Sequence, residues 1–293
     1  MRVGPNLFKN LNVTDVLFLR YYMGYNTYAP DNSLGSLVKC FWTLEFPAAI
    51  SPEKQRIVPD GCMEMIFHYG DVYIQYDAGG AFIVQPRCFV FGQLTMPLVI
   101  EPTGNTGIFA VRFHADGFAP FATIPVKEME NRPVALPELF GEEGLLLEKA
   151  VLNSASTDDR IKIIQAFLLK RLQTPEAIDR IVRSSIDVIM GLNGQVSVDE
   201  LSEQLNINRR QLERKFSSVI GLSPKQLAKI IRLQTTLKML EKKQFTNLTS
   251  LAHENGYFDQ THFIKDFKEF TGLSPKQFYA GSLSMSVLFM AAD

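Results

Sequence analysis

Hydrophobic and polar residues follow two different periods along this chain, and the change of period divides it into two regions. Up to about residue 125, short runs of aromatic and β-branched residues alternate with turn signals, which is typical of antiparallel strands. These runs span residues 41–46, 63–69, 89–91 and 108–113. The first region is therefore predicted to be a β-barrel or a β-sandwich.

A helical period replaces this pattern from Leu136 onward. Apolar residues recur at intervals of three and four up to Leu172, and Thr157 opens a plausible N-cap region. The Thr174-Pro175 pair marks a boundary, since proline restricts the residue before it and readily starts a helix. We therefore expect an α+β protein of two domains. Residues 1–174 form a β-rich sensor, effector or dimerisation domain with a helical C-terminal part, and residues 175–293 form an all-helical domain.

The helical region contains an internal duplication. The sequence GLSPKQ occurs at residues 221–226 and again at residues 272–277, and similar apolar and small residues precede both copies. Each copy fits two helices joined by a short turn, at about 196–220 and about 247–271. A continuous helix from Pro224 to about Lys243 would join them and span about 30 Å, close to the ~34 Å between successive major-groove turns on one face of DNA.

The second helix of each copy has an apolar face and a polar, cationic face. At 100° per residue, the outward positions are Arg210, Arg214, Ser217 and Ser218 in the first copy and Thr261, Lys265 and Lys268 in the second. Arginine can grip guanine with two hydrogen bonds, and lysine and hydroxyl groups can meet bases or phosphates. Helical repeats also build scaffolds that bind proteins, so a protein-interaction module stays an alternative.

Composition and charge are consistent with these predictions and add little to them. The formal net charge of −1 hides a modest asymmetry, because fifteen of the thirty Lys and Arg residues but only thirteen of the thirty-one Asp and Glu residues lie from Pro175 onward. The three cysteines, Cys40, Cys62 and Cys88, lack close spacing, which favours reduced core thiols over a disulfide or zinc site. No apolar run reaches the ~20 residues that a bilayer span needs, and no signal peptide is evident, so we expect a cytoplasmic protein.

The duplicated segments resemble the AraC/XylS family of transcription regulators. LSEQLNINRRQLERKFSSVIGLSPKQL and LAHENGYFDQTHFIKDFKEFTGLSPKQF are similar to the family's two helix-turn-helix units. The resemblance implies binding to double-stranded DNA in two successive turns of the major groove. Phe258 stands where the family commonly has a capping serine, which would move the N-cap to Asp259. Together, the helical wheel and the resemblance give as DNA-binding residues Arg210, Gln211, Arg214, Ser217, Gln260, Thr261, Lys265 and Lys268.

The segment VPDGCMEMIF at residues 58–67 resembles the N-terminal domain of an uncharacterised branch of the same family. This resemblance implies a sensor domain, for which a cupin-like barrel is one form, and an unknown small-molecule effector. Strand alternation places Glu64 and His68 on one face, and Arg112 and His114 on one face of another strand. These four residues could line an effector pocket, or they could be solvent-facing positions of an antiparallel sheet. The turn at Pro59–Gly61 needs no function beyond turning the chain.

The sequence as a whole predicts a sequence-specific DNA-binding transcriptional regulator without catalytic residues, cofactor or metal. RNA polymerase and a second copy in a homodimer are further candidate partners. The rival enzyme, a DNA-repair methyltransferase with a similar C-terminal module, needs a reactive cysteine in a zinc-type cluster, which Cys88 lacks in sequence. Apolar residues 287–290 predict a tail that folds back onto its own chain or onto a partner, and a disordered tail stays the alternative because terminal residues are often loose.

Overall fold

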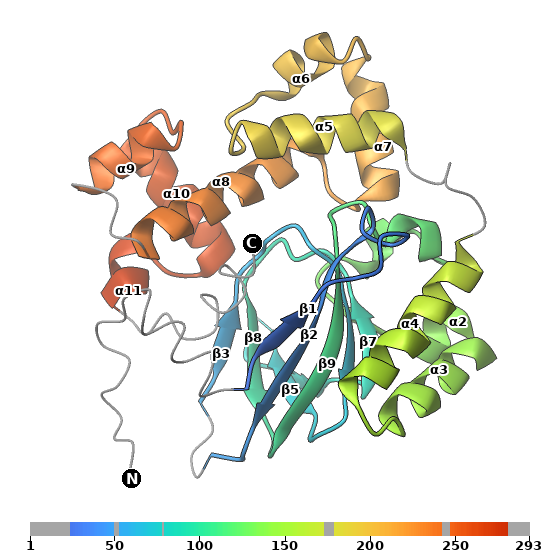
Figure 1. Cartoon of the computed structure of the whole chain (residues 1–293). Coiled ribbons are helices and arrows are strands. Elements are labelled where there is room, and N and C mark those ends of the chain that lie inside the picture. Colours follow the sequence, from blue (N-terminus) through green and yellow to red (C-terminus); the bar gives the residue numbers. More distant parts are fainter. Residues whose placement is uncertain (1–23, 50–52, 78, 173–178, 242–246, 281–293) are drawn as a thin grey trace.

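The computed structural model describes residues 24–49, 53–77, 79–172, 179–241 and 247–280. The chain forms a β-rich N-terminal domain and a helical C-terminal domain that lies across one end of it (Figure 1). The predicted domain boundary at residues 174 and 175 and the predicted apolar tail at residues 284–293 lie outside the described residues. Within the described part of the chain, no helix is both long enough and apolar enough to cross a membrane.

Two antiparallel sheets build the N-terminal domain, and they form a sandwich in which the described strands do not close into a barrel. The sequence predicted either a β-barrel or a β-sandwich, and the structure shows a sandwich. The six-stranded sheet has the order β1 (Asn26–Tyr28), β2 (Val38–Phe46), β9 (Thr106–Phe113), β4 (Glu64–His68), β7 (Cys88–Phe91) and β10 (Pro133–Ala135). The four-stranded sheet has the order β3 (Gln55–Ile57), β8 (Leu98–Pro102), β5 (Tyr73–Tyr76) and β6 (Phe82–Val84).

The central strand β9 is buried along its whole length because both of its faces are covered. Phe109, Val111 and Phe113 point into a core that includes residues of the domain's helices. Ile108 and Ala110 point to the other side, toward the four-stranded sheet. The helical elements of this domain are η1 (Ala119–Phe121), η2 (Val126–Met129), α2 (Leu136–Phe140), α3 (Glu142–Leu152) and α4 (Thr157–Arg171).

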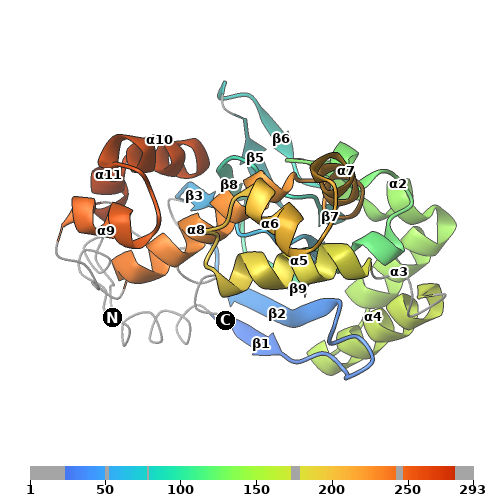
Figure 2. The same cartoon turned by 90° about the horizontal axis from the view of Figure 1, so that it is seen from above.

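Seven helices form the described part of the C-terminal domain. Short α6 and longer α7 make the first helix-turn-helix unit, and α9 and α10 make the second. The helix α8 runs from one unit to the other, above the β domain (Figure 2). The bounds are α5 (Arg180–Gly191), α6 (Val198–Gln204), α7 (Arg209–Val219), α8 (Pro224–Glu241), α9 (Leu248–Glu254), α10 (Gln260–Thr271) and α11 (Pro275–Ala280). The predicted α+β fold with two helix-turn-helix units is confirmed.

The duplicated sequence GLSPKQ folds in the same way in both copies. Gly221 and Gly272 follow α7 and α10 with φ of 81° and 72°, a left-handed conformation that glycine adopts without strain. Ser223 and Gln226 then form reciprocal hydrogen bonds at the start of α8, at 2.9 and 3.2 Å. Ser274 repeats this arrangement at the start of α11. Each copy thus ends a second helix and starts the next one with a capping box.

The two domains pack against each other through α5, α7, α8 and α10, and the contact of α7 is with η2. The contacts across the interface join Arg183 of α5 to Asp116 at 2.7 Å, Gln234 of α8 to the Pro59 carbonyl oxygen at 2.6 Å, and Arg56 to the Thr271 carbonyl oxygen at 3.0 Å. The side chain of Val58 belongs to the core of the helical domain. The β domain therefore contacts the first unit, the connecting helix and the second unit together.

Candidate functional site

The second helix of each unit begins at a side-chain cap. The Asn208 carboxamide accepts a hydrogen bond from the backbone N–H of Arg210 at 2.9 Å, and the Asp259 carboxylate accepts one from the backbone N–H of His262 at 2.7 Å. Such caps satisfy backbone donors that a helix start leaves free. The N-cap of α10 is Asp259, as the sequence suggested, and Phe258 before it is 86% exposed.

The helices α7 and α10 bury one face and expose the other. Leu212 and Phe216 of α7 and Phe263, Phe267 and Phe270 of α10 lie in the core of the helical domain. All eight predicted DNA-binding residues are exposed, namely Arg210, Gln211, Arg214, Ser217, Gln260, Thr261, Lys265 and Lys268.

The cations on these exposed faces are free to meet a ligand. Arg210, Arg214, Lys265 and Lys268 form no ion pair with a described residue, whereas their neighbour Arg209 is paired with Asp199 at 3.0 Å. Lys229 of α8 is likewise held by Asp266 at 3.0 Å. The structure therefore separates cations that stabilise the units from cations that face outward.

A second candidate site is a cavity of about 80 Å3 between the two sheets. One water molecule needs ~10–15 Å3 of such space, so the cavity has room for a small organic molecule. Most of its walls are apolar or aromatic, contributed by Trp42, Leu44, Ile57, Ile66, Tyr73, Phe91, Leu98, Ile100 and Ile108. A few polar side chains at its ends complete the lining, as is usual for small-molecule sites.

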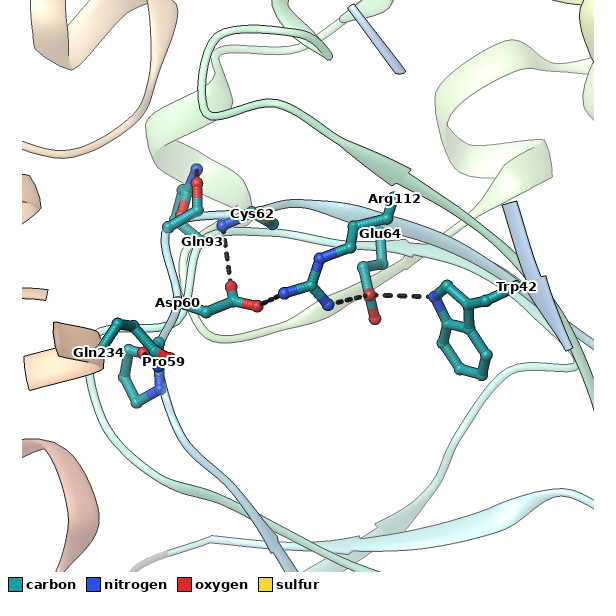
Figure 3. Close-up of polar contacts among 9 residues, drawn as sticks. Trp42, Pro59, Asp60, Cys62, Glu64, Gln93, Arg112 and Gln234 are labelled. Atoms are coloured by element: carbon teal, nitrogen blue, oxygen red, sulfur yellow. Dashed lines mark hydrogen bonds and ion pairs between the residues drawn. The ribbon is translucent and has the colours of Figure 1, made fainter. Parts of the chain in front are cut away.

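A buried ionic cluster forms one end of the cavity (Figure 3). Arg112, which is 4% exposed, forms ion pairs with Asp60 and, at 2.9 Å, with Glu64 Oε1. The same Glu64 oxygen accepts a hydrogen bond from Trp42 Nε1 at 3.1 Å. Burial raises the pKa of Glu64, although Arg112 opposes this shift. Burial also disfavours the charged form of Arg112, but Asp60, Cys62 and Glu64 together raise its pKa well above the usual value.

His68 lies at the other end of the cavity and is 1% exposed. Its ring packs beside Tyr73 and Phe89, with ring centroids 5.5 and 5.7 Å apart. Gln85 lies close enough to favour the charged ring, but neither ring nitrogen has a partner in hydrogen-bonding geometry among the described residues. Burial lowers the pKa of His68 to about 4, so the ring is neutral near pH 7.

The four residues predicted for an effector pocket do not all meet. Glu64, His68 and Arg112 line the cavity. His114 lies instead in a crevice of about 360 Å3 between the domains. Arg112 lines this crevice as well, so it lies beside His114 there and beside Glu64 and His68 in the cavity. Binding of an effector by these residues stays a prediction.

The loop at Pro59–Gly61 links the cavity to the helical domain. Asp60, Arg112 and Gln234 line both the cavity and the interdomain crevice, so the Asp60–Arg112 pair forms a wall between the two spaces. Gly61 has a φ of 78°, and a Cβ atom there would lie 3.0 Å from Leu227 of α8. Gly61 is thus needed both for the turn and for the close approach of α8. Sequence reasoning treated this loop as a turn only and gave no signal for Gln234.

The cysteines offer no reactive thiolate. Burial is the largest cause that raises the pKa of all three thiols, to about 11 for Cys62. All three thiols are free, and Cys40 and Cys88 are buried. No group of three histidine, cysteine or acidic side chains within the described ranges is arranged to hold a metal ion.

Two family models match the chain. A helix-turn-helix domain matches residues 201–280, which contain both units, and a domain of unknown function (DUF6597) matches residues 26–135. The C-terminal domain is an AraC-type helix-turn-helix domain. The resemblance inferred from the two repeated segments is thereby confirmed.

Curated transcriptional regulators also match part of this chain. An uncharacterised HTH-type transcriptional regulator of Haemophilus influenzae is 34% identical over 88 residues, which is 30% of this chain and 29% of that protein. The HTH-type transcriptional regulator MtrA of Neisseria gonorrhoeae is 37% identical over 82 residues, or 28% of this chain and 27% of that protein. The chain thus covers less than a third of the length of these relatives.

Among solved structures, ToxT from Vibrio cholerae is similar over 82% of this chain and 97% of its own, with 13% sequence identity and a TM-score of 0.46. The C-terminal domain of AraT, a response regulator from Geobacillus stearothermophilus, is similar over 34% of this chain and 84% of its own, with 25% identity and a TM-score of 0.33.

Proposed function

We propose that this protein is a cytoplasmic, sequence-specific transcriptional regulator that inserts α7 and α10 into successive major grooves of double-stranded DNA. The observation that carries the proposal is the duplication of one unit with an exposed, unpaired cationic helix face. The connecting helix α8 has 18 residues and spans about 27 Å at ~1.5 Å per residue. This length suits two helices held about one turn of DNA apart.

The exposed faces of α7 and α10 differ in their residues, which suggests that the two helices make different kinds of DNA contact. On α7, Arg210 and Arg214 can each form paired hydrogen bonds with guanine, so this helix would read bases. On α10, Lys265 and Lys268 are point charges, which are better suited to phosphates, and Thr261 can approach a base edge. RNA polymerase and a second copy of the chain are further partners in this proposal.

We assign control of DNA binding to the N-terminal domain. A molecule in the cavity would contact the cluster around Arg112, and Asp60 of that cluster belongs to the loop that holds Gln234 and Leu227 of α8. A shift of this loop would change how the β domain positions the two units. The elevated thiol pKa values keep the cysteines protonated near pH 7, so the proposal gives them no role as nucleophiles.

Selection of genomic DNA fragments by the purified full-length chain, followed by sequencing, tests DNA recognition. We expect a small set of enriched fragments that share a motif. The Arg214→Ala, Lys265→Ala double variant should lose this enrichment while it keeps the wild-type melting temperature. Enrichment of no sequence by the wild-type chain would favour a protein-interaction module instead.

A further inference from the structure

The cavity between the sheets carries an excess of negative charge at one end. Two carboxylates, Asp60 and Glu64, face a single guanidinium, Arg112, and the neutral His68 at the far end adds no charge. Among the described residues that line the cavity, Arg112 is the one cation, whereas Lys39, Arg183 and Lys238 line the interdomain crevice that Asp60 also faces. Asp60 and Glu64 have to share Arg112 as their buried partner, and incomplete pairing of a buried carboxylate is costly, so the cavity favours a guest that brings one positive charge.

Glu64 offers a contact point for such a guest. Its Oε1 atom accepts the hydrogen bonds from both Trp42 and Arg112, and Oε2 accepts none from a described residue. In Figure 3 the dashed lines from Arg112 and Trp42 end on the same Glu64 oxygen, and none ends on the second one. The aromatic faces of Trp42 and Phe91 in the cavity wall suit a cation as well.

The end of the cavity at His68 favours an uncharged polar group on the guest. A neutral imidazole has one donor and one acceptor, and both nitrogens of the buried His68 lack partners among the described residues. A buried polar group without a hydrogen bond is destabilising, so a hydroxyl or carbonyl group of a guest that meets His68 would bind favourably. A hydroxyl can satisfy either nitrogen.

The spacing of the two ends sets the length of the guest. Glu64, Ile66 and His68 share one face of β4, so the two polar residues are four positions apart, about 13 Å along the strand. Ile66, Ile100 and Ile108 line the stretch between them. The body of the guest is therefore apolar.

From this geometry we infer that the cavity binds a small organic cation, a primary amine on an apolar body with a hydroxyl or carbonyl at its far end, with the ammonium at Glu64 and the far end at His68. A carboxylate guest would have to compete with Asp60 and Glu64 for Arg112 and would add to the negative charge. This inference names the effector class for the control assigned above, and it rests on that proposed function only for its regulatory meaning.

Binding is tested on the full-length protein without DNA, by thermal shift and calorimetry with matched probes. The amines are tyramine, phenethylamine and 6-aminohexan-1-ol, and the acids are 3-(4-hydroxyphenyl)propionate and 6-hydroxyhexanoate. We expect the amines to raise the melting temperature and the acids to leave it unchanged. Tyramine should bind about 3- to 10-fold more tightly than phenethylamine, because it alone of the two has a hydroxyl for His68.

Variants locate the site. Glu64→Gln keeps an acceptor for Trp42 and removes the charge, so amine affinity should fall at least about tenfold. Glu101→Gln is the matched control, since Glu101 follows Ile100 on β8 and does not line the cavity. Tighter binding of the acids, no binding of any amine, or equal amine affinity in Glu64→Gln would overturn the inference. These results are independent of whether the protein recognises DNA.

Discussion

The two domains differ in where the polar residues of their candidate sites lie, buried in the β domain and exposed on α7 and α10. In the β domain, Arg112 and His68 are buried in the sandwich, next to a cavity. In the helical domain, three of the six buried polar residues described, Ser185, Thr236 and Thr271, donate a hydroxyl hydrogen bond to a carbonyl of their own helix. The others are Ser202, Asn255 and the paired Asp266.

This difference separates what mutations in the two domains should change. Interior substitutions in the β domain act on stability and on the response to a guest, because they leave charged groups unpaired in an apolar setting. Surface substitutions on α7 and α10 act on DNA binding, because these side chains contribute little to packing. Stability and DNA affinity, measured side by side, therefore test the comparison.

The largest effect is expected for Arg112→Ala. The substitution leaves Asp60 and Glu64 without their buried partner, which should lower the free energy of unfolding by about 3–5 kcal/mol. Arg132→Ala removes an exposed ion pair with Glu138 and should cost less than about 1 kcal/mol. Urea denaturation of both variants measures this contrast. Equal losses of unfolding free energy would show that the buried ion pairs stabilise the fold no more than the exposed one does.

Acidification should destabilise the protein through His68. Its pKa is about 4 in the folded state, below the ordinary 6.5, so the unfolded state binds more protons between these values. Stability is then complete above about pH 6.5 and falls as the pH drops toward 4, by on the order of 3 kcal/mol. His114, whose pKa burial also lowers, adds in the same direction. Melting curves of His68→Gln between pH 4.5 and 7 should show a weaker pH dependence than the wild type, and an identical one would refute the assignment.

On the surface, Arg214→Ala should cost about 1–3 kcal/mol of binding at a cognate site and relax the preference at one base position. Melting temperature should not change, because Arg214 is exposed and has no described ion pair. Lys162→Ala, an exposed cation of α4, is the matched control. Fluorescence anisotropy with a set of single-base operator variants measures both affinity and preference, and an unaltered preference would exclude α7 as a base reader.

The smallest effect is expected for Lys268→Ala. A phosphate contact carries no sequence information, so binding should weaken equally for cognate and random DNA. The slope of log affinity against log salt concentration should become shallower by about 1. Salt titrations of the variant and of Lys162→Ala provide the measurement; a loss confined to cognate DNA would mean that α10 reads bases at this position.

The sequence predicted the elements with strong periodic patterns and missed those that tertiary contacts create. The strands β2, β4, β7 and β9 and the helices α4 and α6 to α8 follow the predicted segments closely. Short strands such as β3 and β6 have too few residues to show alternation. Their place is decided by pairing with β8 and β5, which no local pattern reveals.

The sequence grouped those cavity-lining residues whose positions follow from the alternation of side chains along a single strand. Glu64 and His68 share a face of β4, and Arg112 is the register partner of Glu64 on β9. The partners of this cluster come from elsewhere in the chain, as Asp60 comes from a turn and Gln234 from a helix about 175 residues further on. Only the folded chain brings them together.

The spacing of the two half-sites in selected DNA tests the central claim most directly. If α8 holds α7 and α10 in successive grooves, fragments selected by the wild-type chain should contain two short motifs whose centres lie about 10–10.5 base pairs apart. Insertion of one residue in α8 near Thr236 turns the second unit by about 100° and should abolish selection of this pair while helicity by circular dichroism is largely kept. A single undivided motif, or the same paired spacing selected by the insertion variant, would contradict the account.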